Sequence, residues 1–228
     1  MKKSTLEQIN EARHARRAIA VVTEIGADHQ HLVTNADGLN PELSEAVSKR
    51  LKSGKSGVEI IAEKENFVQV HVPSPRLVVI GAVHISQALV PMAQACGFDV
   101  IVIDPRTGFA STERFEGVNI HAEWPENVLK DNPLDVHTAL IAVTHDPKID
   151  DLPLQEALKT GCFYVGALGS RKTHAKRIDR LSAAGFGKEA LGKIHAPIGL
   201  DIGAASRSEI AVAILAQMIA VLRKGATV

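Results

Sequence analysis

Short apolar runs separated by turn residues fill the first third of the chain. The β-branched content of these runs and the turns between them predict strands, and two segments with helical spacing predict helices. The predicted strands span 18–25, 29–35, 57–64 and 66–73, and the predicted helices span 4–16 and 41–51. Pro73 and Pro75 then mark a boundary. The pattern therefore predicts a small α+β segment over residues 1–75.

After residue 75 the pattern changes to continuous apolar runs that alternate with helical stretches. The run LVVIG at 77–81 is typical of a strand that is buried on both faces of a parallel sheet. The predicted strands are 77–81, 100–104, 118–122, 140–145 and 163–169, and the predicted helices are 84–96, 152–159, 171–184, 188–194 and 207–223. Ser206 and Glu209 have the spacing of a capping box. Strands that alternate with helices form parallel βαβ units, so residues 76–228 predict an α/β domain: a Rossmann-like parallel sheet with flanking helices.

Composition narrows the classes of function. The 228 residues are 45% hydrophobic and 23% charged, which is ordinary for a globular protein. Lys plus Arg and Asp plus Glu both number 26, whereas proteins that bind nucleic acid through its phosphates usually carry a basic excess. No apolar run approaches the ~20 residues that cross a bilayer, and the polar N-terminal sequence lacks the pattern of a secretory signal. We therefore expect a soluble cytoplasmic protein with neither a nucleic-acid nor a membrane partner.

Glycines and polar residues follow four of the predicted strands in the second segment. They are Gly81 to Ser86, Asp104 with Arg106, Thr144 to Asp146, and Gly166 to Arg171. In an open parallel sheet, ligands bind outside the carboxyl ends of the strands, where the strand order reverses. The sequence therefore predicts a small-molecule site at this edge of the sheet.

The first of these strand ends matches only part of a dinucleotide-binding fingerprint. The fingerprint reads G-x-G-x-x-G, whereas the chain reads G-A-V-H-I-S from Gly81. Val83 occupies the position where a glycine lets the backbone approach a pyrophosphate, while Asp104 stands where an acid would bind a ribose. An NAD(P)-dependent oxidoreductase is therefore the alternative function, which Asp104 favours and Val83 opposes. A nucleotidyl-handling enzyme is a third class, and no nucleotidyltransferase loop supports it.

The last strand end has features of an anion site. Ser170 is a candidate cap for the helix that starts near 171, and the first turn of that helix contains Arg171, Lys172 and His174. Positive charge there opposes the helix dipole by about 0.3–1 kcal/mol per group unless an anion binds the free amides. The alternative is a solvated basic helix face, which continues with Lys176, Arg177 and Arg180. We expect Arg171 to contact a bound phosphate and Lys176 to contribute far less.

Two pairs of residues are weaker candidates. His145 and Asp146 form either a polarised pair for proton transfer or ligand contact, or a turn ahead of a proline. His29 and His31 share one face of a predicted strand, yet no third ligand lies nearby, so we expect exposed strand histidines and no metal site.

The two cysteines, Cys96 and Cys162, are expected to be structural. Cys96 lies in an apolar helix and is predicted to belong to the core, and Cys162 precedes a buried strand. Neither has a basic neighbour in the sequence that would lower the pKa of its thiol. We therefore expect neither to carry sulfur.

Five segments resemble, in chain order, the C-terminal domain of the XdhC/CoxI family of xanthine dehydrogenase accessory proteins. They are VIGAVHISQALVPMA (79–93), VIDPRTGFAS (102–111), AVTHDPKID (142–150), YVGALGSRKTHAKR (164–177) and IHAPIGLDIG (194–203). The resemblance implies a molybdenum-cofactor chaperone rather than an enzyme. Such a protein holds a molybdopterin-type cofactor as cargo while a cysteine desulfurase supplies its terminal sulfur, and then delivers it to a xanthine dehydrogenase-like molybdenum hydroxylase.

The resemblance also implies a cofactor-binding role for the residues of these motifs, with no catalytic residue and no resident metal. The residues are Gly81, Ala82, Val83, His84, Ile85, Asp104, Arg106, Thr144, His145, Asp146, Gly166, Gly169, Ser170, Arg171, His174, Pro197, Asp201 and Gly203. The phosphate of molybdopterin suits the helix start at Ser170 and Arg171. Its pterin edge presents N–H donors, which a carboxylate can accept; the candidates are Asp104, Asp146 and Asp201.

The chain departs from longer members of this family in its first segment. Those relatives have an N-terminal domain with a cysteine in a glycine-rich stretch, whereas residues 1–75 contain no cysteine. We expect this segment to form an oligomer or partner surface instead, with a homodimer as one arrangement. The sequence leaves open whether the cargo is the mononucleotide or the dinucleotide form of the cofactor.

Overall fold

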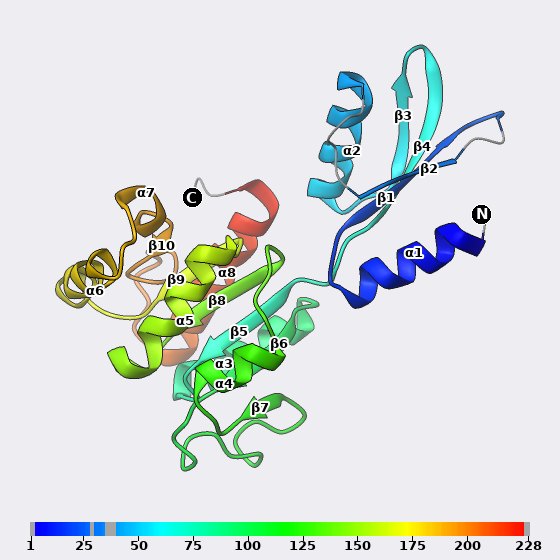
Figure 1. Cartoon of the computed structure of the whole chain (residues 1–228). Helices are drawn as coiled ribbons and strands as arrows, with labels where there is room; N and C mark the ends of the chain where they lie inside the picture. Colours follow the sequence, from blue (N-terminus) through cyan, green and yellow to red (C-terminus); the bar gives the residue numbers. More distant parts are fainter. Residues whose placement is uncertain (1–2, 28–29, 35–39, 226–228) are drawn as a thin grey trace. The chain divides into compact units, whose positions relative to one another are not determined.

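The computed structural model describes residues 3–27, 30–34 and 40–225, and the chain divides into two compact units (Figure 1). They are Met1–Pro73 and Ser74–Val228. The boundary falls at the proline-containing segment between the last strand of the first unit and the first strand of the second.

The smaller unit is a four-stranded antiparallel sheet with the order β2-β1-β4-β3 and two helices. Its elements are α1 (Lys3–His14), β1 (Ile19–Glu24), β2 (Gln30–Val33), α2 (Pro41–Ser53), β3 (Gly57–Ile61) and β4 (Lys64–His71). Asn40 caps α2 by accepting a hydrogen bond from the Leu43 amide at 2.8 Å. Buried Val22 and Val68 of the sheet join Val47 of α2 in a small core. These helices and antiparallel strands agree with the α+β segment that the sequence predicts.

The larger unit is built on a six-stranded parallel sheet with the order β10-β9-β8-β5-β6-β7. The strands are β5 (Arg76–Ile80), β6 (Asp99–Ile103), β7 (Asn119–His121), β8 (Thr138–Ala142), β9 (Tyr164–Ala167) and β10 (Ile194–His195). Counted along this unit, the order is the 3-2-1-4-5-6 of doubly wound dinucleotide-binding folds. The order reverses between β5 and β8, which are neighbours. The predicted Rossmann-like fold is therefore confirmed.

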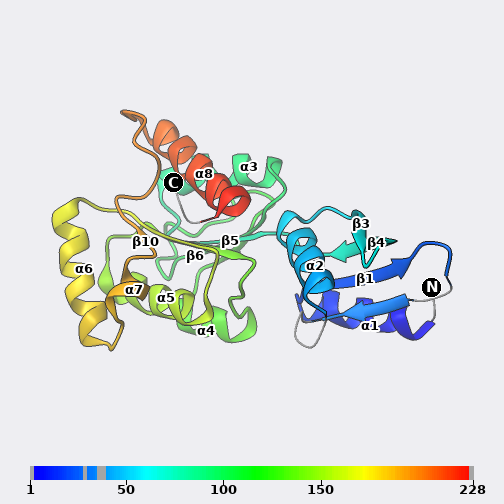
Figure 2. The ribbon, with the colours of Figure 1, turned by 90° about the horizontal axis from the view of Figure 1, so that it is seen from above.

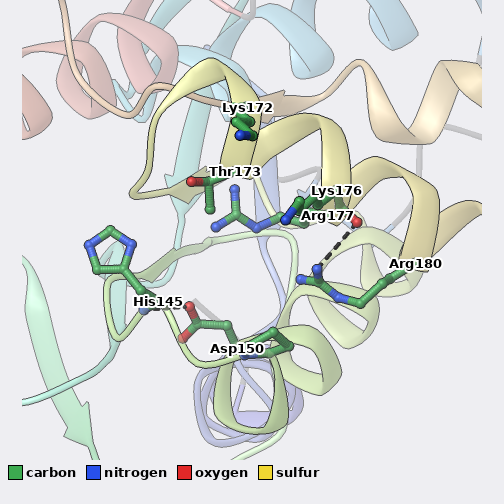
Figure 3. Close-up of a pocket in the computed structure, with 8 residues that line it drawn as sticks. His145, Asp150, Lys172, Thr173, Lys176, Arg177 and Arg180 are labelled. Atoms are coloured by element: carbon green, nitrogen blue, oxygen red, sulfur yellow. Dashed lines mark hydrogen bonds between the residues drawn. The ribbon is translucent and has the colours of Figure 1, made fainter.

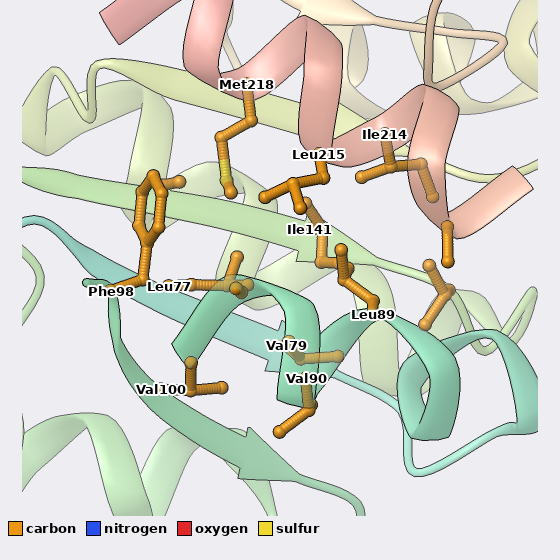
Figure 4. Close-up of a cluster of buried hydrophobic side chains, with 14 of the residues drawn as sticks. Leu77, Val79, Leu89, Val90, Phe98, Val100, Ile141, Ile214, Leu215 and Met218 are labelled. Atoms are coloured by element: carbon orange, nitrogen blue, oxygen red, sulfur yellow. The ribbon is translucent and has the colours of Figure 1, made fainter. Parts of the chain in front are cut away.

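Helices cover both faces of this sheet (Figure 2). They are α3 (His84–Ala95), α4 (Pro125–Asp131), α5 (Pro147–Thr160), α6 (Arg171–Ala183), α7 (Lys188–Leu191) and α8 (Arg207–Lys224). Alternate residues of β5 separate the two cores: Leu77 and Val79 pack on the side of α3 and α8, and Val78 and Ile80 pack on the opposite side. Figure 4 shows the first core, in which side chains of α3 and α8 meet those of the strands. The central strands β5 and β8 are buried at every position, and apolar side chains fill all but the first position of each.

Among the predicted helices, two differ most from the structure. The helix predicted at 152–159 begins at Pro147, because Asp146 caps it and Pro147 suits a first helical position. The helix predicted over 188–194 ends at Leu191, and Ile194 instead pairs with Val165 in the parallel sheet.

The capping box of Ser206 and Glu209 is present at the start of α8. Across the described part of the chain, no helix has the length and apolar character that crossing a bilayer requires.

Candidate functional site at the carboxyl edge of the parallel sheet

Gly81 allows two loops to approach each other at the point where the strand order reverses. Its φ is +117°, and a Cβ atom there would lie 2.8 Å from Cγ2 of Thr144, in the loop after β8. The buried Ser86 hydroxyl donates to the Gly81 carbonyl at 2.6 Å and fixes the turn into α3. Val83 is the N-cap of α3, and its own side chain provides no capping hydrogen bond. The first turn of α3 therefore presents uncapped amides near the switch point, which suits an anion.

Asp104, which follows β6, stabilises the turn after Gly81 through hydrogen bonds. Its carboxylate is fully buried and accepts hydrogen bonds from the Ala82 amide at 2.8 Å and from the Arg106 amide at 3.0 Å. The Arg106 guanidinium adds a bidentate pair at 2.8 and 2.7 Å. Burial by itself raises the pKa of Asp104, but the hydrogen bonds from Arg106 and Ala82 outweigh it and hold that pKa below its ordinary value. Asp104 is therefore an ionised anchor, with its oxygens already engaged.

The loop between β8 and α5 is held by a carboxylate that sequence reasoning missed. Asp150 is only 2% exposed. One of its oxygens accepts from the Thr144 hydroxyl at 2.6 Å, and the other accepts from the His145 amide at 3.1 Å. His145 has a φ of +66°, an uncommon conformation for a side-chain-bearing residue that these contacts hold in place. Burial raises the pKa of Asp150 to about 6, although the Thr144 hydrogen bond and the charge of Arg177 oppose that rise.

The turn between β9 and α6 brings its backbone close to neighbouring segments. A Cβ atom at Gly166 would lie 2.5 Å from Ile198, and Gly169 has a φ of +136°. Ser170 caps α6 by accepting from the Thr173 amide at 3.2 Å, as predicted. Arg171 is exposed, and His174 is half-buried. Burial and the nearby Arg177 both lower the pKa of His174, which favours the neutral ring.

A cavity of about 280 Å³ opens between the β8–α5 loop and helix α6. We call it the α6 cavity; it is lined by His145, Pro147, Asp150, Lys172, Thr173, Lys176, Arg177 and Arg180 (Figure 3). Lys176 lines the cavity, whereas Arg171 is not among the lining residues. That Arg171 contacts a bound phosphate and Lys176 contributes less stays a prediction. Arg177 is 2% exposed, so the idea of a fully solvated basic face is wrong for it.

The segment between β10 and α8 contains Pro197, Asp201 and Gly203, which are exposed and do not line the α6 cavity. Neighbouring Ile198 is buried, and the Gly199 amide donates to the Gln217 side chain of α8 at 2.9 Å. The segment is thus anchored at its start. The carboxylate of Asp201 is exposed, and within the described residues it makes no hydrogen bond or ion pair with the other strand-end loops.

Neither cysteine lines the α6 cavity. Cys96 is exposed, so its prediction as a core residue is wrong: α3 ends at Ala95, and Cys96 lies past the face that buries Leu89 and Ala93. Cys162 is half-buried, and burial raises the pKa of its thiol to about 12, which disfavours the thiolate. His31 is exposed on β2, and His29 lies outside the described residues. Within those residues no group of three metal-ligating side chains occurs.

Asp150 and Arg177 were missed because each stands in a run of charged residues. The available signal was helical position. Arg177 is four residues before buried Leu181, and Asp150 is four residues before buried Leu154. A charge on the inward face of a helix is uncommon unless it is paired or functional. Arg177 shares a helix face with buried Leu181, and this position distinguishes it from its neighbour Lys176.

The strand order defines a doubly wound α/β domain of the Rossmann kind, with the strand-end loops at its switch point. The family described as the XdhC Rossmann domain matches residues 77–218. This chain belongs to the XdhC family.

Curated relatives and a solved structure extend the likeness. The chain is 27% identical over 230 residues to a Bacillus subtilis (strain 168) protein named as a probable xanthine dehydrogenase subunit, covering 100% of this chain and 68% of that protein. It is 30% identical over 149 residues to the molybdenum cofactor insertion chaperone PaoD of Escherichia coli (strain K12), covering 65% of this chain and 41% of that protein. A crystal structure described as a xanthine dehydrogenase from Bacillus halodurans has a TM-score of 0.66 at 21% identity, covering 96% of this chain and 64% of that one, which supports the fold.

Proposed function

We propose that this protein is a maturation factor, not an enzyme, that binds the molybdenum cofactor as cargo and passes it to a molybdenum hydroxylase of the xanthine dehydrogenase type. Membership of the XdhC family and the names of the relatives support this role. The finer steps belong to the same proposal. The protein holds the cofactor while a cysteine desulfurase replaces a terminal ligand with sulfur, and a homodimer is one form in which it does so.

The observation that carries the proposal is the convergence of glycine-rich and polar loops at the switch point. Gly81 lets the β5–α3 turn and the loop after β8 lie close together, and the uncapped start of α3 offers amides to an anionic group. The motif residues from Gly81 to Ile85, Thr144 to Asp146, Gly166 to His174 and Pro197 to Gly203 are the proposed contacts. Such a row of loops suits a ligand that carries an anionic group.

The carboxylates divide into different roles in this proposal. Asp104 and Arg106 are bound to each other, so we assign them to shaping the Gly81 turn rather than to contacting the pterin. Asp146 accepts from the Lys148 amide at 3.0 Å through one oxygen, which leaves its other oxygen for an N–H donor. Asp201 is exposed and is the second candidate for the pterin edge.

Binding is tested by mixing the purified full chain with molybdopterin-type cofactor and separating the mixture by gel filtration. We expect roughly one cofactor to remain with each chain, because the larger unit has one switch point. An unrelated Rossmann-fold protein of similar size is the control. Retention no greater than that of the control would contradict the proposal.

The NAD(P)-dependent oxidoreductase remains the second candidate, since the strand order is that of dinucleotide-binding domains. The position of Asp104 weighs against it, because a ribose-binding acid must face the ligand and this one is fully buried under Ala82. Calorimetry with NAD and NADP decides between the two. Tight binding of either nucleotide, with no retention of molybdopterin, would favour the oxidoreductase over the maturation factor.

A further inference from the structure

Arg177 is a buried cation with unused hydrogen-bond donors. Its side chain is 2% exposed, and its Nη2 donates to the Leu168 carbonyl at 2.8 Å, which fixes the guanidinium against the β9–α6 turn. Within the residues that the structure describes, the buried Nε and Nη1 atoms have no hydrogen-bond partner. Buried donors of this kind are nearly always satisfied in proteins. Figure 3 shows this guanidinium between α6 and the loop of His145 and Asp150, where it lines the α6 cavity.

The protein's own acids do not satisfy these donors. Asp150 lines the opposite side of the cavity, but its oxygens are engaged by Thr144 and His145. Asp151 is turned to Arg180, with which it makes a bidentate pair at 2.6 and 2.9 Å. Within the described residues the guanidinium therefore makes no hydrogen bond to a carboxylate, and Asp150 and Asp151 act on it only through their charge.

Two further cations line the cavity without acidic partners. Lys172 and Lys176 are exposed, and no described carboxylate forms an ion pair with either. Four cationic side chains thus line the cavity beside one acid, Asp150, and of the four only Arg180 forms an ion pair within the described residues, with Asp151. The start of α6 adds the positive end of its helix dipole. This charge excess favours a dianion rather than a monovalent or neutral ligand.

We propose that the α6 cavity is a phosphate site, with Arg177 as its inner ligand and Lys172 and Lys176 at its mouth. A guanidinium presents donors in a fork that matches two oxygens of a tetrahedral oxyanion, and the Nε and Nη1 of Arg177 are the donors left over. The volume of about 280 Å³ accepts a phosphate group with its water but is small for a whole nucleotide. The ligand is therefore either free phosphate or the phosphate monoester end of a larger molecule that extends along the sheet edge.

The site is tested with inorganic phosphate and the full chain in a phosphate-free buffer of low salt. Binding is followed by calorimetry and by the ¹H–¹⁵N signal of the Arg177 Nε–H group. We expect this signal to move as phosphate binds, because Nε gains a hydrogen-bond acceptor. An unmoved Arg177 signal at saturating or tens-of-millimolar phosphate would overturn the proposal.

Variants separate this site from a general basic field. Lys172→Ala combined with Lys176→Ala should weaken phosphate binding about tenfold or more, and Arg177→Lys should weaken it about tenfold to a hundredfold, because the forked contact is lost. Lys188→Ala combined with Lys193→Ala is the matched control, because it removes two exposed lysines that do not line the cavity, and it should change binding less than about twofold. If Arg177→Lys fails to fold, the variants of Lys172 and Lys176 still test the site. Equal losses for this control and for the double variant of Lys172 and Lys176 would refute the site.

The source of the phosphate is a separate question, and only this part rests on the proposed function. If the phosphate is that of the cargo, molybdopterin and inorganic phosphate will compete for the chain. If it is free phosphate, both will bind at once. Absence of molybdopterin binding with phosphate binding intact would contradict the proposed function and leave this site standing.

Discussion

Asp150 gives a quantitative test of the electrostatics around the α6 cavity. Its pKa is raised from 3.8 to about 6 in the folded protein. Since one pKa unit corresponds to about 1.36 kcal/mol, burying the ionised carboxylate costs about 3 kcal/mol of folding free energy. The folded state binds this proton more tightly than the unfolded state, so the contribution to stability is present at low pH. It is lost as the pH rises from 3.8 to about 6.

Asp150→Asn should remove this cost. The amide can keep both contacts, because its oxygen can accept from the His145 amide and its NH₂ group can donate to the Thr144 hydroxyl. We expect the free energy of unfolding to rise by about 2–3 kcal/mol at about pH 8 and to change little at about pH 4.

The assay is urea unfolding followed by fluorescence of Trp124, the single tryptophan, which reports on the larger unit. Asp151→Asn is the matched control, since it makes the same chemical change at the surface pair with Arg180 and should lower stability by at most about 1 kcal/mol. A loss of stability in Asp150→Asn that is equal at both pH values would refute the reasoning. It would mean that the ionised carboxylate stabilises the fold.

Three further predictions concern the site and the cysteines. Gly81→Ala should destabilise the larger unit by about 1–3 kcal/mol beyond Gly97→Ala in the same urea assay, because both have positive φ but only the first new Cβ would meet an atom, at 2.8 Å; equal losses would contradict the close approach. Asp104→Ala should cost about 3–5 kcal/mol by leaving a buried network unpaired, and a cost under about 1 kcal/mol would show that the network is dispensable. Cys96→Ser with Cys162→Ser should leave cofactor retention on gel filtration intact apart from any stability loss, and a folded double variant that retains no cofactor would disprove this.

The fold could be predicted from the sequence because its main signal is local. Continuous apolar runs such as 77–81 identify strands that are buried on both faces, and Ser206 with Glu209 marks a helix start without any tertiary information. The two-residue strand β10 could not be found in this way. Ile194 and His195 become a strand only because Val165 and Gly166 lie beside them.

The candidate site was predicted as a set of loops but not as a set of contacts. The strand ends are readable from sequence, and parallel strands bring their carboxyl ends to one edge. The pairing of Asp104 with Arg106, and the inward turn of Arg177, depend on packing. Cys96 shows the opposite error, since its apolar neighbours indicate burial while the end of α3 leaves it exposed.

The central claim is that the molybdenum cofactor binds at the carboxyl edge of the parallel sheet, and amide chemical shifts of the full chain test it most directly. We predict that adding the cofactor moves the signals of Ala82 to Ser86, Thr144 to Asp146 and Gly169 to Arg171, while signals of the opposite sheet edge, such as Asp99 and Thr138, stay in place. A bound cofactor that leaves all three loops unchanged, or no change anywhere in the spectrum, would contradict the account.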